Sequence, residues 1–286
     1  MASVKAYVKL SRLEHGLMVA LAVFTGAFAV EEMGVFSIGK IIKLVLGMVS
    51  GVLVEAGIFA FNDYFNVEED RINAPDRPLV TGELSLREAF LFGFLTLSAG
   101  VLINALINLY ALVLVALTAF IGMLYNAYFK KSGIFGNFLV AYSTALPFVY
   151  GALVLGYFPE VPLNVILFSA VAFFAALGRE IVKGIRDIEG DRKADVRTLA
   201  IIAGSQTAAT LASLLFITAV ILSLYLHFFV KNPLLYLALL APTDLIFLYS
   251  AYSIVEKPTI ENADSLRKKT LIGMALGIMS FFLSSL

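Results

Sequence analysis

The stretch IIKLVLGMVSGVLVEAGIFAFNDYFNVEED, residues 41–70, joins an almost wholly apolar run to a sudden group of amides and acids. Residues 41–61 contain two charged side chains, those of Lys43 and Glu55. Because about 20 helical residues cross the hydrocarbon core of a bilayer, the apolar part predicts a membrane-spanning helix. Its polar continuation, which runs to Glu83, is then expected at a membrane surface.

The composition of the whole chain indicates the same environment. Of the 286 residues, 60% are hydrophobic and 15% are charged, and the mean hydropathy is +0.91. Soluble domains carry about 25% charged residues, so we predict an integral membrane protein. The absence of cysteine excludes disulfides and thiolate metal sites. The formal net charge of zero argues against a nucleic-acid partner, and nothing in the sequence implies a protein partner.

Apolar segments of spanning length predict an all-α fold with about nine transmembrane helices. We expect the first segment to be retained, because no small-residue cleavage site follows a short apolar core. The expected spans are residues 13–30, 41–65, 88–108, 110–129, 134–156, 162–184, 205–229, 233–254 and 269–286.

The basic residues predict the orientation of these helices. With the N-terminus in the cytoplasm, 18 of the 21 Lys and Arg residues fall on the inner side. Only Lys40, Lys43 and Lys231 fall outside. Cytoplasmic loops carry such an excess of positive charge. We therefore expect a multi-pass protein of the cell membrane, with its polar cap loops in the cytoplasm.

Polar residues at the end of the second span recur with a helical period. Asn62, Asn66 and Asp70 follow one another at steps of four, which places them on one helix face at about 100° per residue. Glu55 falls on the same face, deeper in the apolar run. Charges at membrane depth are costly and are functional candidates by default.

The sixth span ends in a similar stretch, GREIVKGIRDIEGDRKADVRT at residues 178–198. Charged residues again recur every four positions, at Arg179, Lys183, Asp187, Asp191 and Asp195. If the helix ends at Gly190, Asp195 does not lie on the shared face.

The two polar stretches predict an internal repeat. DRINAPDR begins at Asp70 and DRKADVR begins at Asp191, which lies 121 residues later. That separation corresponds to four spans, so we expect two four-helix halves and one added helix. Each half would contribute one acidic helix end to a shared cytoplasmic-side cavity, within a single domain over residues 1–286.

Other boundary acids have a simpler explanation as solvated loop charges. We assign this explanation to Glu83, Glu88, Glu256, Glu261 and Asp264.

The clustered residue types favour a phosphate-bearing lipid substrate. Carboxylate and amide oxygens suit Mg²⁺, which also bridges substrate phosphates. The chain has two histidines, which makes a zinc site an unfavoured alternative. Nearby cations suit phosphate oxygens. These cations are Arg71, Arg77, Lys130, Lys131, Lys183 and Arg186.

At these residues the sequence resembles the UbiA-type intramembrane prenyltransferases. The first family motif appears as NDYFNVEED, followed by RINAPDRPLVTGE, and the second appears as DIEGD within REIVKGIRDIEGD. YNAYFKKSGIFGN at 125–137 also resembles the family pattern. The resemblance implies Mg²⁺-dependent transfer of a prenyl group, with catalytic residues Asp70, Asp187 and Asp191. It implies that the metal ligands are Asn62, Asn66, Asp70, Asp187 and Asp191, and that the diphosphate is bound by Arg71, Arg77, Lys130 and Lys183.

Two positions depart from the family pattern. Asn66 stands where the family usually has Asp, and Gly184 stands where many members have Asp. The charge of the metal would then be offset mainly by the three aspartates. Asp63 lies about 100° around the helix from Asn62, and we rank it below the other candidates.

The implied reaction ionises an allylic diphosphate to a carbocation that an acceptor then attacks. The second motif is most similar to that of archaeal members that make digeranylgeranylglyceryl phosphate, which implies a geranylgeranyl donor and a geranylgeranylglyceryl phosphate acceptor. RLEHGL at 12–17 is instead similar to members using 4-hydroxybenzoate-like acceptors. Candidate acceptor residues are Arg12, His15, Tyr142 and Ser143.

A secondary transporter is the alternative of a different class, because repeats with charged, broken helices also occur there. A transporter site is expected near the bilayer midplane, whereas these motifs lie at helix ends.

Overall fold

The computed structural model describes residues 3–129, 132–193 and 195–286, without the side chains of residues 72 and 73. Every regular element in these ranges is a helix, and the chain divides into two compact units. Unit 1 comprises Met1–Ala27, Gly34–Phe129 and Tyr150–Phe158. Unit 2 comprises Phe28–Met33, Lys130–Val149 and Pro159–Leu286.

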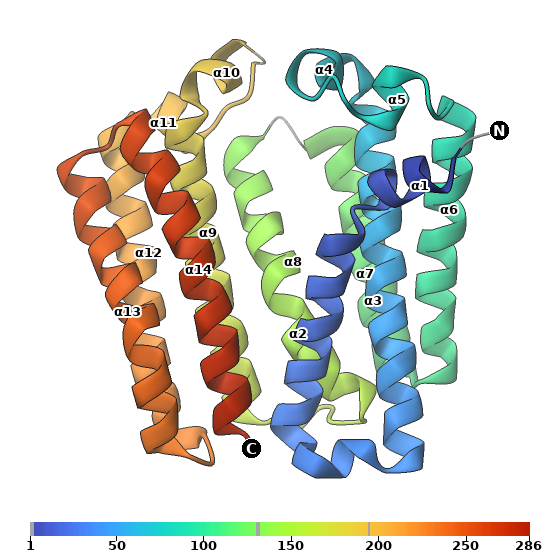
Figure 1. Cartoon of the computed structure of the whole chain (residues 1–286), viewed down its shortest axis with the longest axis vertical. Helices are drawn as coiled ribbons and strands as arrows, with labels where there is room; N and C mark the ends of the chain where they lie inside the picture. The colour runs from blue at the N-terminus through green and yellow to red at the C-terminus, as the bar shows by residue number, and fades with distance from the viewer. Residues whose placement is uncertain (1–2, 130–131, 194) are drawn as a thin grey trace. The chain divides into compact units, whose positions relative to one another are not determined.

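Long helices account for most of the described chain (Figure 1). They are α2 (Leu13–Glu31), α3 (Ile38–Phe65), α6 (Leu86–Ile103), α7 (Leu109–Leu124), α8 (Gly133–Val154), α9 (Leu163–Arg186), α12 (Ser205–Leu226), α13 (Pro233–Glu256) and α14 (Ile260–Ser284). The short helices are α1 (Val4–Ser11), α4 (Val67–Asn73), α5 (Pro78–Thr81), α10 (Ile188–Lys193) and α11 (Leu199–Ile202).

Eight of the long helices described are long and apolar enough to cross a membrane. Their positions agree with the first eight expected spans to within a few residues. The ninth expected span corresponds to α14, whose start we placed nine residues too late. This helix begins at Ile260 because the Thr259 hydroxyl caps it, accepting a hydrogen bond from the Asn262 N–H at 3.3 Å. Its charged first turns concealed this start in the hydropathy pattern.

Large apolar side chains remain exposed on these helices. Leu95 and Leu102 on α6 are 63% and 66% exposed, and Leu245 on α13 is 67% exposed. Extended apolar surfaces of this kind are unfavourable in water and suit contact with lipid chains. The structure therefore agrees with an all-helical membrane protein.

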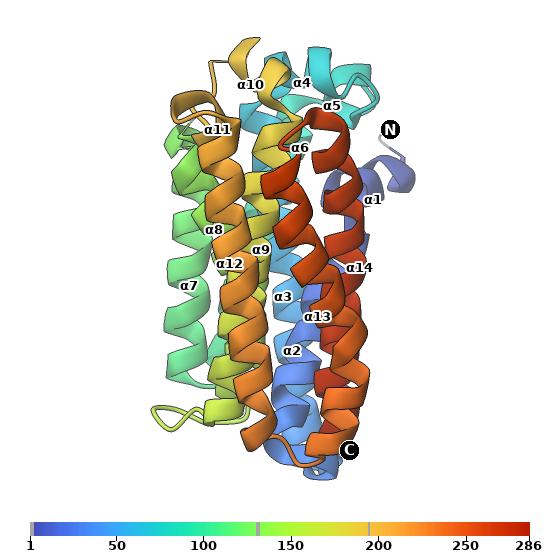
Figure 2. The same cartoon turned by 90° about the vertical axis from the view of Figure 1, so that its left-hand side faces the viewer.

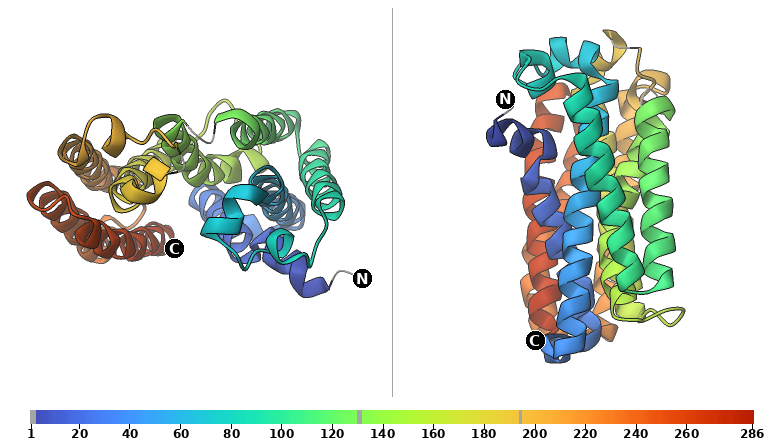
Figure 3. Two further views of the ribbon diagram at one scale, coloured as in Figure 1. Left: turned by 90° about the horizontal axis from the view of Figure 1, so that it is seen from above. Right: turned by 90° about the vertical axis from the view of Figure 1, so that its right-hand side faces the viewer.

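In unit 1, α3 packs along α6 (Figures 1 and 3). Small residues lie at this contact. A Cβ atom at Gly57 would lie 2.9 Å from the backbone nitrogen of Leu97, and one at Gly100 would lie 3.0 Å from that of Val54. Glycine at these positions allows the two backbones to approach closely, as is common between membrane helices. This contact fixes the position of the long helix that carries the first motif.

In unit 2, α9 packs against α12, and α12, α13 and α14 pack side by side (Figure 2). Ile181, Val182 and Ile185 from the last turns of α9 belong to one buried apolar cluster with small residues of α12. Those small residues are Ala208, Ala209 and Ala212. The end of α9, where the second motif begins, is thus held by apolar contacts on its non-polar face.

Short helices follow the polar end of a long helix in each unit. In unit 1, α4 and α5 follow α3, and α1 contacts both α3 and α5. The Lys9 ammonium lies 3.1 Å from Asp76 Oδ2 in the turn between α4 and α5. In unit 2, α10 and α11 follow α9. The N-terminal helix and the first motif therefore lie at the same end of unit 1 (Figure 1).

Candidate active site

The first motif lies at an interruption of the long helix α3. The helix ends at Phe65, and Asn66 leaves the helical conformation, with φ −119° and ψ 20°, before α4 begins at Val67. The Asn66 side chain donates a hydrogen bond to the main-chain carbonyl of Asn62. Asparagine side chains compete with the helical backbone for carbonyls in this way. The continuous helical face expected through Asp70 is therefore wrong, although Asp70 N–H still donates to Asn66 O at 2.9 Å.

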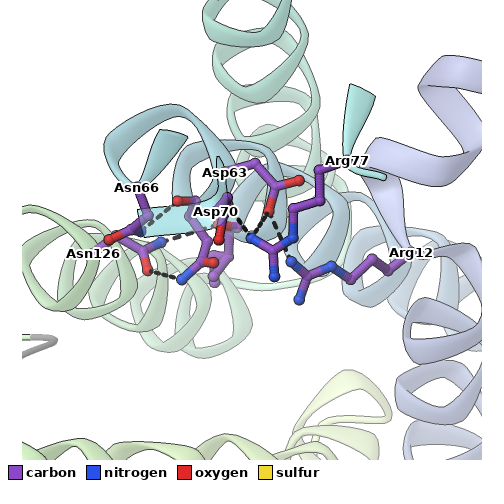
Figure 4. A network of polar contacts seen from close by, with 8 residues as sticks. Arg12, Asp63, Asn66, Asp70, Arg77 and Asn126 are labelled. Carbon is purple, nitrogen blue, oxygen red and sulfur yellow. Dashed lines mark hydrogen bonds and ion pairs between the residues drawn. The ribbon is translucent and has the colours of Figure 1, made fainter. Parts of the chain in front are cut away.

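A buried carboxylate, Asp63, holds two arginines beside this interruption (Figure 4). Asp63 is 2% exposed, and its Oδ1 lies 2.7 Å from Arg12 Nη2 and 2.9 Å from Arg77 Nη1. Arg77 also donates to Asp70 Oδ2. Burial lowers the pKa of the Arg12 guanidinium, and the Asp63 carboxylate opposes that shift. Two arginines thus neutralise two carboxylates next to the first motif.

The turn after α7 supplies an amide to this cluster. Asn126 lies in the π-helical turn Tyr125–Phe129 after α7 and is 4% exposed. Its Nδ2 donates to the Ile58 carbonyl at 3.0 Å, and its Oδ1 accepts from Asn62 Nδ2 at 3.0 Å. Figure 4 shows Asn126 beside Asn66.

The second motif lies at an equivalent interruption in unit 2. Helix α9 ends at Arg186, Asp187 has φ −91° and ψ 5°, and α10 begins at Ile188. The Arg186 guanidinium binds Asp187 in a bidentate manner, with both N–O distances at 2.6 Å. Asp191 N–H donates to Asp187 O at 2.9 Å.

Asp191 lies in an electrostatically unfavourable position for an ionised carboxyl. Partial burial, together with the neighbouring Asp187 carboxylate, raises the pKa of Asp191. A nearby like charge disfavours ionisation, and a bound cation would relieve that repulsion. Because the Arg186 guanidinium already pairs with Asp187, a cation bound by Asp187 and Asp191 stays a prediction.

About two turns before the second motif, the buried carboxylate of Glu180 binds two cations. Arg179 Nη1 and Lys183 Nζ each lie 3.2 Å from a Glu180 carboxylate oxygen. Lys183 is half-exposed in this arrangement, so its role in binding a diphosphate stays a prediction.

The expected phosphate-binding arginines of unit 1 differ in environment. Arg77 is held between two carboxylates. The Arg71 side chain is 62% exposed and lies 3.3 Å from the exposed Glu68 carboxylate. Lys130, which follows the fourth span and is also expected to bind the diphosphate, lies outside the described residues.

The acceptor candidates fall in both units. In unit 1, the Arg12 guanidinium lies 4.2 Å from the centre of the Phe59 ring, and the His15 ring lies 5.1 Å from the same ring. In unit 2, Tyr142 and Ser143 lie on α8, where the Ser143 hydroxyl donates to the Val140 carbonyl of its own helix at 2.9 Å. Arg12 thus lies beside the first motif, bound to Asp63.

The oxygen donors of each motif suit a hard divalent cation. In unit 1 the NH₂ groups of Asn62 and Asn66 both donate hydrogen bonds, so a metal would have to be bound by their side-chain oxygens, and their role as ligands with Asp70 stays a prediction. In unit 2 the donors are the carboxylates of Asp187 and Asp191. In the part of the chain that the structure describes, no three His, Cys, Asp or Glu side chains form a metal cluster by themselves. Since the two motifs belong to different units, a shared metal site stays a prediction.

Three contributing residues escaped the sequence analysis or received too little weight there. Asp63 was ranked below the other site candidates because it lies on a different helix face from Asn62, but its carboxylate binds both Arg12 and Arg77. Arg186 directly precedes Asp187 and pairs with it, which its adjacency could have indicated. Asn126 gave one usable signal, an amide at the end of an otherwise apolar span.

Comparisons with known proteins place the chain in a family. The model of the UbiA prenyltransferase family matches residues 19–285. A digeranylgeranylglyceryl phosphate synthase of Archaeoglobus fulgidus is 36% identical, over 99% of this chain and 97% of that protein. A solved structure described as giving insights into digeranylgeranylglyceryl phosphate synthase in membranes has a TM-score of 0.85 and 30% identity, covering 100% of this chain and 99% of that one.

A UbiA homolog from Archaeoglobus fulgidus, solved with DMAPP and Mg²⁺, shares the fold, with a TM-score of 0.71 and 24% identity over 96% of this chain and 98% of that one. Together with the family match over nearly the whole length, these similarities identify the chain as a member of the UbiA prenyltransferase family.

Proposed function

We propose that this protein transfers a geranylgeranyl group from its allylic diphosphate to the hydroxyl group of geranylgeranylglyceryl phosphate, forming an ether lipid precursor. One observation carries this proposal most directly. Each unit ends a long apolar helix in the same arrangement, where oxygen ligands at a helix interruption lie beside an arginine. The relatives named digeranylgeranylglyceryl phosphate synthase support the choice of acceptor.

In this proposal both units act as one prenyltransferase domain over residues 1–286, with the two motifs at a common site. Asp70, Asp187 and Asp191, together with Asn62 and Asn66, would hold Mg²⁺. When bound, Mg²⁺ would offset the charge of the diphosphate and of the departing pyrophosphate. The donor set supports this ion, as does its presence with DMAPP in the related UbiA homolog.

The residues of the chain would bind the leaving group. Arg71, Arg77, Lys130 and Lys183 would contact pyrophosphate oxygens, because cationic donors bind such oxygens strongly. The C–O bond of the allylic diphosphate breaks, and its electron pair leaves with pyrophosphate. The acceptor hydroxyl oxygen then bonds to the allylic carbon, and its proton passes to the released pyrophosphate or to water. The short helices α4, α5, α10 and α11 would limit access of water to the allylic carbocation.

The acceptor would bind near the first motif through its anionic group. The pair of Arg12 and His15 around Phe59 supports an anion site, and Tyr142 and Ser143 are the candidates from α8. Because Arg12 is already bound to Asp63, the Arg12 guanidinium would bind an acceptor anion together with the Asp63 carboxylate.

The function is tested with purified protein, geranylgeranyl diphosphate and Mg²⁺, offered geranylgeranylglyceryl phosphate or 4-hydroxybenzoate. We expect pyrophosphate release and a product with the mass of digeranylgeranylglyceryl phosphate. A prenylated benzoate instead would establish the aromatic acceptor. No pyrophosphate release with either acceptor would contradict prenyl transfer and favour the transporter alternative.

A further inference from the structure

Asn126 reaches the first motif from a different helix. Its π-helical turn follows α7, and π-helical turns are often found at functional sites. The side chain is almost completely buried and makes both of its hydrogen bonds to α3. A buried amide with specific partners on the motif helix can set the orientation of a side chain in that motif.

The orientation of the Asn126 amide follows from hydrogen-bond chemistry. A main-chain carbonyl can only accept, so the Asn126 atom 3.0 Å from Ile58 O must be its NH₂ group. The other atom of the amide is therefore an oxygen, which requires a donor. Asn62 supplies that donor from its NH₂ group at 3.0 Å. The Asn62 amide oxygen must then point away from Asn126.

The same reasoning applies to Asn66. Its side chain contacts the main-chain carbonyl of Asn62, so the contacting atom must be the NH₂ group. The Asn66 amide oxygen is consequently left as an acceptor. Two carbonyl groups of α3, those of Ile58 and Asn62, thus determine which atoms of the two motif amides remain for a ligand.

We propose that Asn126 is a positioning residue that orients the Asn62 amide so that its oxygen, rather than its NH₂ group, is presented to the metal. An NH₂ group cannot ligate a cation, so a reversed amide would remove one ligand. This inference rests on the proposed metal-dependent function. Partners that orient metal ligands affect metal affinity by about 10- to 100-fold.

The test measures Mn²⁺ binding to the full-length protein in detergent, from the loss of the free-ion EPR signal, without any substrate. Asn126→Leu keeps a similar shape but removes both hydrogen bonds, and we expect Mn²⁺ affinity to fall by at least about tenfold. In an Asn62→Asp background either carboxylate oxygen can ligate, so adding Asn126→Leu should cause no further loss. Such non-additivity is expected only where the two residues act together.

Asn104→Leu is the matched control. Asn104 is also a buried amide of unit 1, and it bonds to Ser50 Oγ at 2.8 Å and Tyr150 OH at 2.6 Å. Its loss should lower the melting temperature without changing Mn²⁺ affinity. If Asn126→Leu does not fold, Asn126→Ala replaces it, because the smaller side chain removes the same two hydrogen bonds and should lower Mn²⁺ affinity in the same way.

Two results would overturn the inference. They are parental Mn²⁺ affinity in Asn126→Leu, or in Asn126→Ala where that variant replaces it, and an equal loss in both Asn62 backgrounds. A parental protein that binds no Mn²⁺ would contradict the metal-dependent function itself, and with it this inference.

Discussion

Asn66 in unit 1 and Asp187 in unit 2 hold equivalent positions, since each is the non-helical residue between a long apolar helix and a short helix. They are separated by 121 residues, as are Asp70 and Asp191. In both units the later aspartate donates its N–H to the carbonyl of the residue at the interruption, at 2.9 Å. The internal repeat thus extends to the backbone conformation of the motifs.

The amide at position 66 predicts an unequal division of charge between the motifs. A neutral amide oxygen can ligate Mg²⁺ without offsetting its charge. We therefore expect Asn66→Ala to lower turnover less than Asp187→Ala does. Asn66→Asp should preserve activity and reduce the Mg²⁺ concentration that is needed. Turnover against Mg²⁺ concentration checks this, and loss of activity in Asn66→Asp would mean that donation to the Asn62 carbonyl is essential.

The contrast between Arg77 and Arg71 gives a second prediction. Arg77→Ala would leave the buried Asp63 and Asp70 carboxylates without a shared cation, and such losses cost about 3–5 kcal/mol. Arg71 forms an exposed pair with Glu68, and its removal should cost at most about 1 kcal/mol.

Thermal unfolding in detergent should therefore separate the two variants. Because the chain contains no cysteine, thiol oxidation does not affect this comparison. For Arg71→Ala we expect weaker binding of geranylgeranyl diphosphate at nearly unchanged stability. Equal melting temperatures for Arg77→Ala and Arg71→Ala would show that the buried cluster does not depend on Arg77.

The positive-inside pattern predicts membrane orientation. Single cysteines at Glu68, beside the first motif, and at Glu189, beside the second, should react with a membrane-impermeant maleimide only from the cytoplasmic side. A cysteine at Glu160, in the turn between α8 and α9, should react only from outside. All three side chains are exposed. Labelling of Glu68→Cys and Glu189→Cys from opposite sides would exclude a shared site.

Close helix packing predicts the effect of enlarging Gly57. Its Cβ position lies 2.8 Å from Leu97 Cβ and 3.0 Å from the Gly93 carbonyl. Gly57→Val should therefore force α3 and α6 apart and destabilise unit 1 by about 1–3 kcal/mol. Gly39→Val is a suitable control, because no atom lies near its Cβ position. Equal melting temperatures for these two variants would mean that the contact adjusts without cost.

The sequence predicted the helices well because their apolar runs have the length that a bilayer requires. It did not predict the interruption at Asn66, because helical periodicity says nothing about a side chain that binds a carbonyl of its own helix. The role of Asp63 was missed for a related reason. Its partners Arg12 and Arg77 are distant in sequence and are brought to it by α1 and α5. Residues that form a site through tertiary contacts leave little trace in local spacing.

The central claim is that both motifs act together in one Mg²⁺-dependent prenyl transfer. A double-mutant cycle measures this directly, using turnover of purified protein with geranylgeranyl diphosphate and geranylgeranylglyceryl phosphate. Asp70→Ala and Asp187→Ala should each lower turnover by orders of magnitude, and the double variant should be hardly worse than the poorer single variant, because groups that act as a unit are not additive. Near-parental turnover in either single variant, or losses that multiply in the double variant, would contradict a single shared site.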